Sequence, residues 1–208
     1  ILATSSIKEA IEYYRLIKAQ SDLNITTLFD PNIDNNGAAH DKAAGLLEIV
    51  EDYNQKFGQD FTFVTHAKFK KDIAARLGHK KPYAHIAKNP EQQINLLIVV
   101  DQMLTGFDSK WLNTLYLDKV IKYENIIQAF SRTNRLFNEI EKPFGTIRYY
   151  RKPHTMEQHI NRAVKLYSGD KPIALFVQRL ESNLNKLNAI FKEIAELFAH
   201  AGVANFQK

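Results

Sequence analysis

A glutamine and two arginines near residue 130 have the spacing of a phosphate-binding group. Gln128, Arg132 and Arg135 stand in the sequence Q-A-F-S-R-T-N-R, and on a helix these spacings would bring all three to one face. A guanidinium stays charged and can bridge two phosphate oxygens, so an arginine offered across a cleft stabilises the charge that develops during phosphoryl transfer. From these residues alone, a solvated basic helix face remains the alternative.

A second segment, earlier in the chain, favours a nucleotide site over that alternative. Thr105-Gly106-Phe107-Asp108 follows a continuously apolar run at 96–100, which is typical of a strand buried on both faces of a parallel sheet. Ligands of doubly wound sheets bind beyond the carboxyl ends of the strands. There, Gly106 would let the backbone approach a phosphate, and Asp108 would accept a hydrogen bond from a ribose hydroxyl or hold a neighbouring arginine.

Alternating strand and helix patterns predict the elements that position these groups. Short apolar runs bounded by polar or turn residues predict strands, and apolar residues at helical spacing predict helices. The expected strands span residues 1–4, 25–29, 96–100, 114–117 and 146–150, and the expected helices span 6–19, 41–57, 69–77, 123–137 and 157–167. This order predicts an α/β fold with a doubly wound, mainly parallel sheet and right-handed crossovers.

The pattern changes after residue 150, which predicts two parts. We expect one domain over residues 1–152, with a helical insertion at about 36–93 to which no motif assigns a role. A helical segment should then occupy 153–208. From Ile173 onwards, apolar residues line one face of a long amphipathic helix, as is typical of packing against another domain or helix.

The composition is that of an ordinary globular protein and excludes several classes. The 208 residues are 45% hydrophobic and 25% charged, include no cysteine, and carry a formal net charge of +5. The lack of cysteine excludes disulfides, Cys-ligated metals and a cysteine nucleophile, and it fits a reducing compartment, so we expect a cytoplasmic protein. No apolar run is long enough to span a membrane, and the histidine spacings predict no metal site.

The amino-acid sequences of both segments resemble those of a known family. Residues 101–108 are similar to motif V of superfamily 2 helicases, and residues 128–135 are similar to their motif VI. Together with the intervening L-N-T-L, they resemble the restriction (R) subunit of type I restriction–modification enzymes, in its second RecA-like motor domain and the start of its C-terminal helical domain. The match is most specific over 96–150, where S-R-T-N-R replaces the G-R-T-G-R usual in DEAD-box proteins.

The resemblance implies a large bacterial subunit that uses ATP and Mg²⁺ to pump double-stranded DNA and to cut it. Partner methyltransferase (M) and specificity (S) subunits would supply methylation and recognition. Carried onto this chain, the resemblance makes Arg135 the arginine finger and Arg132 a γ-phosphate contact, while Gln128 would position their helix at the ATP.

The same resemblance puts Gly106 and Asp108 on the ATP side of the cleft and Thr105 against a DNA phosphate. The chain has neither a G-x-x-x-x-G-K-[ST] loop nor a D-E-x-H acidic motif for magnesium. We therefore expect a fragment, opening at Ile1 without an initiator methionine, that neither hydrolyses ATP nor cleaves DNA without the first motor lobe of the same subunit.

Two other functions remain open. One is a non-catalytic helicase-like module that binds nucleic acid or a protein through its C-terminal helix, and the other is the second lobe of an RNA helicase. Basic clusters at 68–71 and 80–81 could contact phosphates along a duplex, and residues 149–152 interleave tyrosines with cations as a nucleic-acid surface does. A solvated face and an ordinary strand end are the simpler interpretations of these groups.

Overall fold

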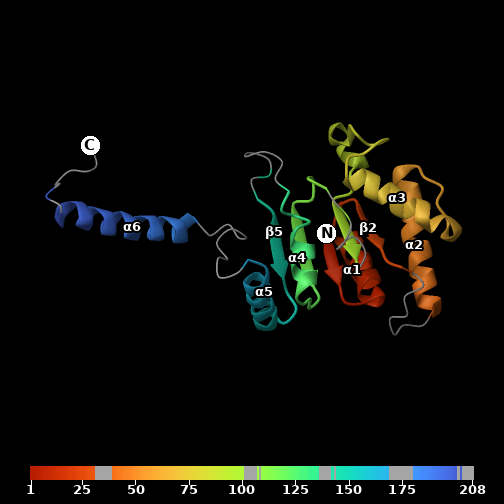
Figure 1. Cartoon of the computed structure of the whole chain (residues 1–208). Helices are drawn as coiled ribbons and strands as arrows, with labels where there is room; N and C mark the ends of the chain where they lie inside the picture. Colours follow the sequence, from red (N-terminus) through yellow and green to blue (C-terminus); the bar gives the residue numbers. More distant parts are fainter. Residues whose placement is uncertain are drawn as a thin grey trace. The chain divides into compact units, whose positions relative to one another are not determined.

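A computed structural model shows five strands and six α-helices in the described part of the chain (Figure 1). The structure describes residues 1–30, 39–100, 107, 109–135, 142, 144–168, 180–200 and 202.

All five predicted strands are present, and they pair in parallel. The strands are β1 (Leu2–Thr4), β2 (Ile25–Leu28), β3 (Leu96–Val99), β4 (Thr114–Asp118) and β5 (Thr146–Tyr149). Their spatial order is β2-β3-β1-β4-β5, and Ala3 of the central strand pairs with both Val99 and Leu117. Because β2 and β3 lie on one side of β1, and β4 and β5 lie on the other, the sheet is doubly wound, and the predicted RecA-like α/β fold is confirmed.

Helices connect the strands close to the predicted positions. They are α1 (Ile7–Gln20), α2 (Ala39–Phe57), α3 (His66–Leu77), α4 (Glu124–Phe130) and α5 (Pro153–Ser168), with short 3-10 turns at Phe63–Thr65, Ile86–Lys88 and Pro90–Gln92. Ser6 caps α1, because its side-chain oxygen accepts a hydrogen bond from the backbone nitrogen of Glu9 at 3.2 Å. The Glu9 carboxylate in turn accepts from the backbone nitrogen of Ser5 at 2.9 Å.

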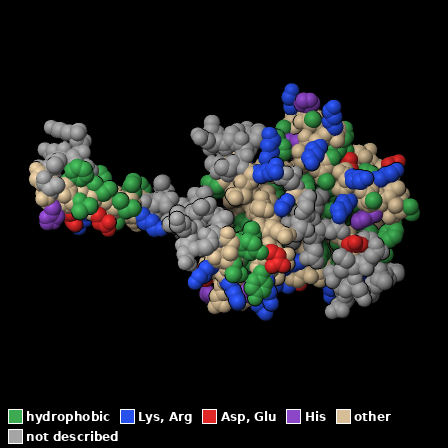
Figure 2. All heavy atoms as spheres, viewed as in Figure 1, with side chains coloured by type: hydrophobic (Ala, Val, Ile, Leu, Met, Phe, Trp, Pro, Cys, Tyr) green, Lys and Arg blue, Asp and Glu red, His purple; other side chains and the backbone are tan. Residues whose placement is uncertain are grey.

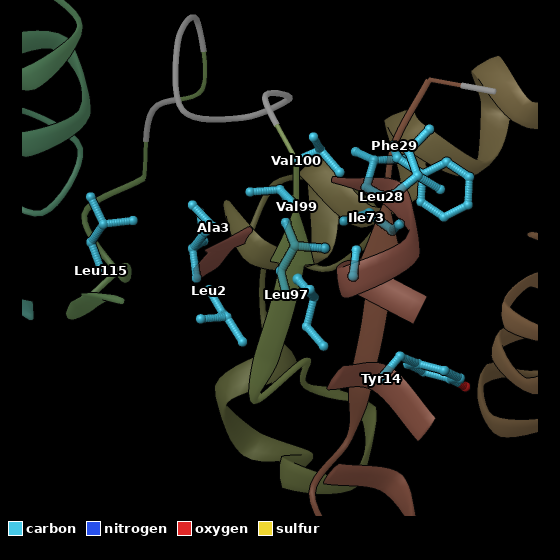
Figure 3. Close-up of a cluster of buried hydrophobic side chains, with 14 of the residues drawn as sticks. Leu2, Ala3, Tyr14, Leu28, Phe29, Ile73, Leu97, Val99, Val100 and Leu115 are labelled. Atoms are coloured by element: carbon cyan, nitrogen blue, oxygen red, sulfur yellow. The ribbon is translucent and has the colours of Figure 1, made fainter. Parts of the chain in front are cut away.

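One hydrophobic core joins the sheet to the helices of residues 39–93. Figure 3 shows Leu97 and Val99 of β3 beside Leu28 at the end of β2, with Ile73 of α3 and Tyr14 of α1 around them. All five side chains are at most 2% exposed. The helices between β2 and β3 therefore contribute to the main core of the molecule. Burial of such side chains stabilises a fold by roughly 1.5–3 kcal/mol each.

The chain divides into two compact units, Ile1–Tyr167 and Ser168–Lys208. Helix α5 belongs to the first unit, since its Met156 and Ala163 are fully buried in the core. The second unit holds α6 (Leu180–His200), which has the predicted amphipathic sequence and exposes apolar side chains such as Leu187 and Phe191. The domain boundary expected at 152 stays a prediction. No helix within the described ranges is long and apolar enough to cross a membrane.

Candidate nucleotide-binding site

The three residues predicted to face a phosphate lie at and beyond the end of α4. Gln128 is in the last turn of the helix, which stops at Phe130. Arg132 belongs to the turn that follows, and Arg135 lies in non-helical chain. The prediction of a helix continuing to residue 137 is therefore wrong, and the two arginines do not share a helical face.

Side-chain hydroxyls explain why α4 ends where it does. The Ser131 Oγ donates to the carbonyl of Gln128 at 2.8 Å, and the Thr133 Oγ1 donates to the carbonyl of Phe130 at 3.1 Å. These bonds satisfy carbonyls that another helical turn would otherwise have used. Thr133 is also buried against Gly145, on which a Cβ would come within 2.2 Å of the Thr133 carbonyl oxygen. The turn is thus fixed by local bonds and by a close backbone contact.

The Arg132 side chain joins this turn to Phe107 of the T-G-F-D sequence. Its Nε donates to the carbonyl of Gln128 at 2.9 Å, and its Nη1 donates a short hydrogen bond to the carbonyl of Phe107. The two bonds hold the guanidinium in one orientation, and its Nη2 has no hydrogen bond to another described residue. A guanidinium held in this way suits the binding of an anion through its remaining edge.

A buried lysine holds the backbone at Arg135. The Lys142 Nζ donates to the carbonyl of Arg135 at 2.6 Å and to the carbonyl of Lys110 at 3.0 Å. Burial lowers the pKa of the Lys142 ammonium, while the two carbonyls supply hydrogen bonds that replace those of water. Arg135 is an exposed residue, and the Lys142 bond fixes its backbone.

These residues gather at the amino ends of two strands. Phe107 and Lys110 precede β4, and Gly145 directly precedes β5. Helix α4 follows β4 in the chain and returns toward the amino ends of the strands, so the turn after it contacts Phe107 and Gly145 there. The carboxyl-end rule used for the T-G-F-D sequence therefore does not account for Arg132 and Arg135. Sequence reasoning also missed Lys142 and Gly145, since neither stands in a recognisable motif.

The other three predicted site residues, Thr105, Gly106 and Asp108, lie outside the described residues. Within the part of the chain that the structure describes, no group of three His, Asp or Glu side chains could hold a metal ion.

An ion-pair network occupies the opposite edge of the sheet, at the carboxyl ends of β1, β4 and β5. The Arg151 Nη2 lies 3.1 Å from the Oε1 of Glu9 and 3.1 Å from the Oδ2 of Asp118. Tyr13 donates to the same Asp118 oxygen at 2.9 Å, and this bond is the main cause of a raised Tyr13 pKa. The Arg151 charge is offset within the fold, so residues 149–152 offer a nucleic acid one cation fewer than their sequence suggests.

Comparison with known proteins identifies the family. Residues 1–152 match the family described as domain 3 of the type I restriction enzyme subunit R. The endonuclease subunit of a type I restriction enzyme from Staphylococcus aureus (strain COL) is 36% identical over 182 aligned positions, which cover 81% of this chain and 18% of that protein. A putative type I endonuclease subunit from Methanocaldococcus jannaschii is 29% identical over 200 positions, covering 93% of this chain and 16% of its own length.

The chain thus spans less than a fifth of the length of these relatives. The family match includes all five strands, the turn that bears Arg132 and Arg135, and the buried Lys142. The chain therefore belongs to the R-subunit family of type I restriction enzymes, through the third domain of that subunit.

Proposed function

We propose that this chain is the second motor lobe of an ATP-driven DNA translocase and that it supplies arginines to an ATP site completed by the first motor lobe of the same subunit. The relatives are endonuclease subunits of type I restriction enzymes, and the match is to a third domain. The resemblance implies a subunit with a nuclease domain and two motor lobes, in which a third domain would be the second lobe. The observation that carries the proposal is the bond from Arg132 to the Phe107 carbonyl, because it joins the motif V segment to the motif VI turn.

In this proposal, Arg135 is the arginine finger and Arg132 contacts the γ-phosphate through its Nη2. ATP with Mg²⁺ supplies the phosphoryl group that is transferred to water. Gln128, exposed in the last turn of α4, lies on the ATP side. Gly106 and Asp108 would line the same side of the cleft. The Mg²⁺ would be held mainly by the first lobe.

The contacts around the two arginines favour catalysis because they reduce reorganisation. The bonds of Arg132 to two carbonyls and the bond of Lys142 to the Arg135 carbonyl restrict the turn before any nucleotide binds. Preorganised cations stabilise the charge that develops in a transition state more than mobile ones do. An arginine finger in phosphoryl transfer contributes about 10³–10⁵ in kcat.

The proposal also includes partners. Double-stranded DNA would be the substrate, with Thr105 at one of its phosphates, and M and S subunits would provide methylation and sequence recognition. Since the chain has no G-x-x-x-x-G-K-[ST] loop, it should neither hydrolyse ATP nor cleave DNA without the remainder of the endonuclease subunit.

Replacing the proposed finger tests the function directly. In the complete endonuclease subunit, Arg135→Ala should lower DNA-stimulated ATP hydrolysis by about 10³-fold or more, because the transition-state charge loses its cation. Binding of an ATP analogue, measured by calorimetry, should be largely retained. Arg162→Ala is the matched control, since Arg162 is an exposed arginine on α5 whose guanidinium carbon lies 5.5 Å from the Tyr123 ring centroid. Normal turnover by Arg135→Ala would refute the proposal.

The polynucleotide that stimulates hydrolysis separates this function from the two alternatives. Duplex DNA should stimulate the unaltered subunit strongly and duplex RNA weakly. Equal or greater stimulation by RNA would favour an RNA helicase lobe, and the absence of ATP hydrolysis in the presence of either would favour a non-catalytic module.

A further inference from the structure

A basic surface lies on α3 and the segment after it. Residues 66–88 contain six lysines and one arginine against one aspartate, a formal charge of +6, whereas the whole chain carries only +5. Arg76 is buried, and its Nε lies 3.0 Å from the Oδ2 of Asp72, so these two charges offset each other inside the fold. The other six cations are all exposed, and we call them the α3 lysine surface: Lys68, Lys70, Lys71, Lys80, Lys81 and Lys88.

The charge of this surface is not neutralised locally. None of its six lysines forms an ion pair with another described residue. Figure 2 shows Lys and Arg side chains gathered over α3 and over the segment between α3 and β3, with few acidic side chains among them. Burial lowers the pKa of His66 and of His79, which favours the neutral form of both imidazoles at pH 7.

The aromatic side chains of residues 66–88 are used within the fold. Phe69 is fully buried, and the Tyr83 ring lies 4.1 Å from the guanidinium carbon of Arg76 while its hydroxyl donates to Asp72. Proteins that bind single strands combine a basic groove with exposed aromatic rings on which bases stack. Within residues 66–88 the lysines are exposed, whereas Phe69 is buried and Tyr83 is half-buried. This combination suits a double helix, whose phosphates face outward and whose bases are already stacked.

The size of the surface fits such a ligand. Helix α3 has 12 residues and is about 18 Å long at 1.5 Å per residue. Each strand of a DNA duplex presents a phosphate about every 3.4 Å along the axis. The helix alone can therefore face about five base pairs, and the lysines at 80, 81 and 88 extend the surface beyond its end.

The surface is attached to the candidate nucleotide site through a short, packed connection. The Ser109 Oγ donates to the carbonyl of Leu77, the last residue of α3, at 2.8 Å. The ring of His79 stacks on Trp111 with centroids 4.1 Å apart. Ser109 and Trp111 come just after Phe107, whose carbonyl accepts the hydrogen bond from Arg132. The end of α3 is thus bonded to Ser109, which lies two residues after the Phe107 that positions Arg132.

We propose that the α3 lysine surface binds the phosphate backbone of duplex DNA without regard to base sequence. The inference rests on the proposed function, which makes DNA the polyanion, and it adds the place where this lobe holds the duplex. Lysines that neutralise phosphates release condensed counterions, so the affinity depends steeply on salt concentration.

Two triple variants of the 208-residue chain test the surface. One carries Lys68→Gln, Lys70→Gln and Lys71→Gln, and the other carries Lys80→Gln, Lys81→Gln and Lys88→Gln. Binding of a fluorescent DNA duplex is titrated without nucleotide at several salt concentrations. Each triple variant should bind more weakly. The slope of log K against log salt should become shallower by about 0.9 for each phosphate that a lysine no longer neutralises, about 2.7 for three.

A control triple has the same change in net charge at exposed lysines elsewhere in the first unit: Lys56→Gln, Lys122→Gln and Lys165→Gln. Its slope should equal that of the unaltered chain, and circular dichroism should show that all three variants keep their helices. Equal slopes for control and test variants, no salt-dependent binding by the unaltered chain, or tighter binding of an RNA duplex or a single strand would each overturn the inference.

This outcome is independent of the test of the motor function, because no ATP is present. Normal DNA binding by the α3 triple variants would refute DNA binding by this surface but would not bear on the role of Arg135. Normal ATP hydrolysis by Arg135→Ala would refute the proposed arginine finger but would not bear on the measured salt slopes.

Discussion

Arg76 carries a full positive charge into the interior of the first unit. Its guanidinium carbon lies 4.2 Å from the Phe57 ring centroid, and its Nη1 donates to the carbonyl and to the side chain of Gln92 at 3.0 Å each. Its Nε bonds to Asp72, whose carboxylate also accepts from Tyr53 at 2.5 Å. A buried charge is tolerated only when it is paired and hydrogen-bonded, so this residue needs every one of these partners.

Arg76→Ala should therefore destabilise the chain by roughly 3–5 kcal/mol, because the partly buried Asp72 carboxylate would lose its cation. Urea denaturation followed by circular dichroism measures the loss. Arg15→Ala is the control: Arg15 pairs with Glu48, but about half of its side chain is exposed, and the change should cost less than about 1 kcal/mol. Similar losses for both variants would contradict the structural role given to Arg76.

The sequence reveals site residues that belong to a motif. It does not reveal site residues whose role depends on contacts with residues far away in the chain. Gln128, Arg132 and Arg135 are recognisable by type and spacing. The role of Lys142 depends on its hydrogen bond to the carbonyl of Lys110, 32 residues away in the chain. The role of Gly145 depends on its contact with the backbone of the buried Thr133. No local pattern encodes either contact. Roles for Gln128, Arg132, Arg135 and for the residues at 105–108 stay predictions.

At the scale of elements, the strands were predicted more reliably than the helix ends. The clearest case is β3, a short apolar run whose burial in a parallel sheet explains the pattern directly. The helical pattern of the sequence continues beyond Phe130, where α4 ends, and no glycine or proline there predicts that end. The actual signals were the hydroxyls of Ser131 and Thr133 and the approach of β5, and only the hydroxyls are visible in the sequence.

The close contact between the turn that bears Arg132 and the glycine before β5 can be tested by Gly145→Ala. A methyl group there would approach the Thr133 carbonyl oxygen to 2.2 Å, so the turn has to move. We expect a loss of stability of roughly 1–3 kcal/mol. Under the proposed function, the complete endonuclease subunit should also lose DNA-stimulated ATP hydrolysis by about 10–100-fold, since small displacements of catalytic groups cost about 10²-fold.

Gly58→Ala provides the matched control for this substitution. Gly58 has a φ of +64°, where an alanine costs about 1–2 kcal/mol, but its Cβ would meet nothing within 4 Å. It should destabilise the chain to a similar extent and leave ATP hydrolysis unchanged. Equal activity losses in both variants would mean that stability alone, and not the position of the turn, limits the rate.

At the scale of the whole molecule, the end of the first unit is the feature that sequence and structure define differently. The change in pattern predicted a boundary at 152, and the family match also ends there. The structure continues the first unit to Tyr167, because Met156 and Ala163 of α5 complete its core. The His159 ring nitrogen Nδ1 also lies 3.0 Å from the carbonyl of Ile121, which ties α5 to the segment before α4.

Two truncated chains distinguish these boundaries. A chain of residues 1–167 keeps every buried hydrophobic residue of the described core, so its free energy of unfolding in urea should be close to that of the first unit in the 208-residue chain. A chain of residues 1–152 lacks the fully buried Met156 and Ala163. It should be less stable by roughly 2–5 kcal/mol or more, since that is the range for deleting one large core side chain. Its core would also be open to water where α5 had packed. Equal stability of the two truncated chains would show that α5 is an accessory to the first unit and would favour the boundary at 152.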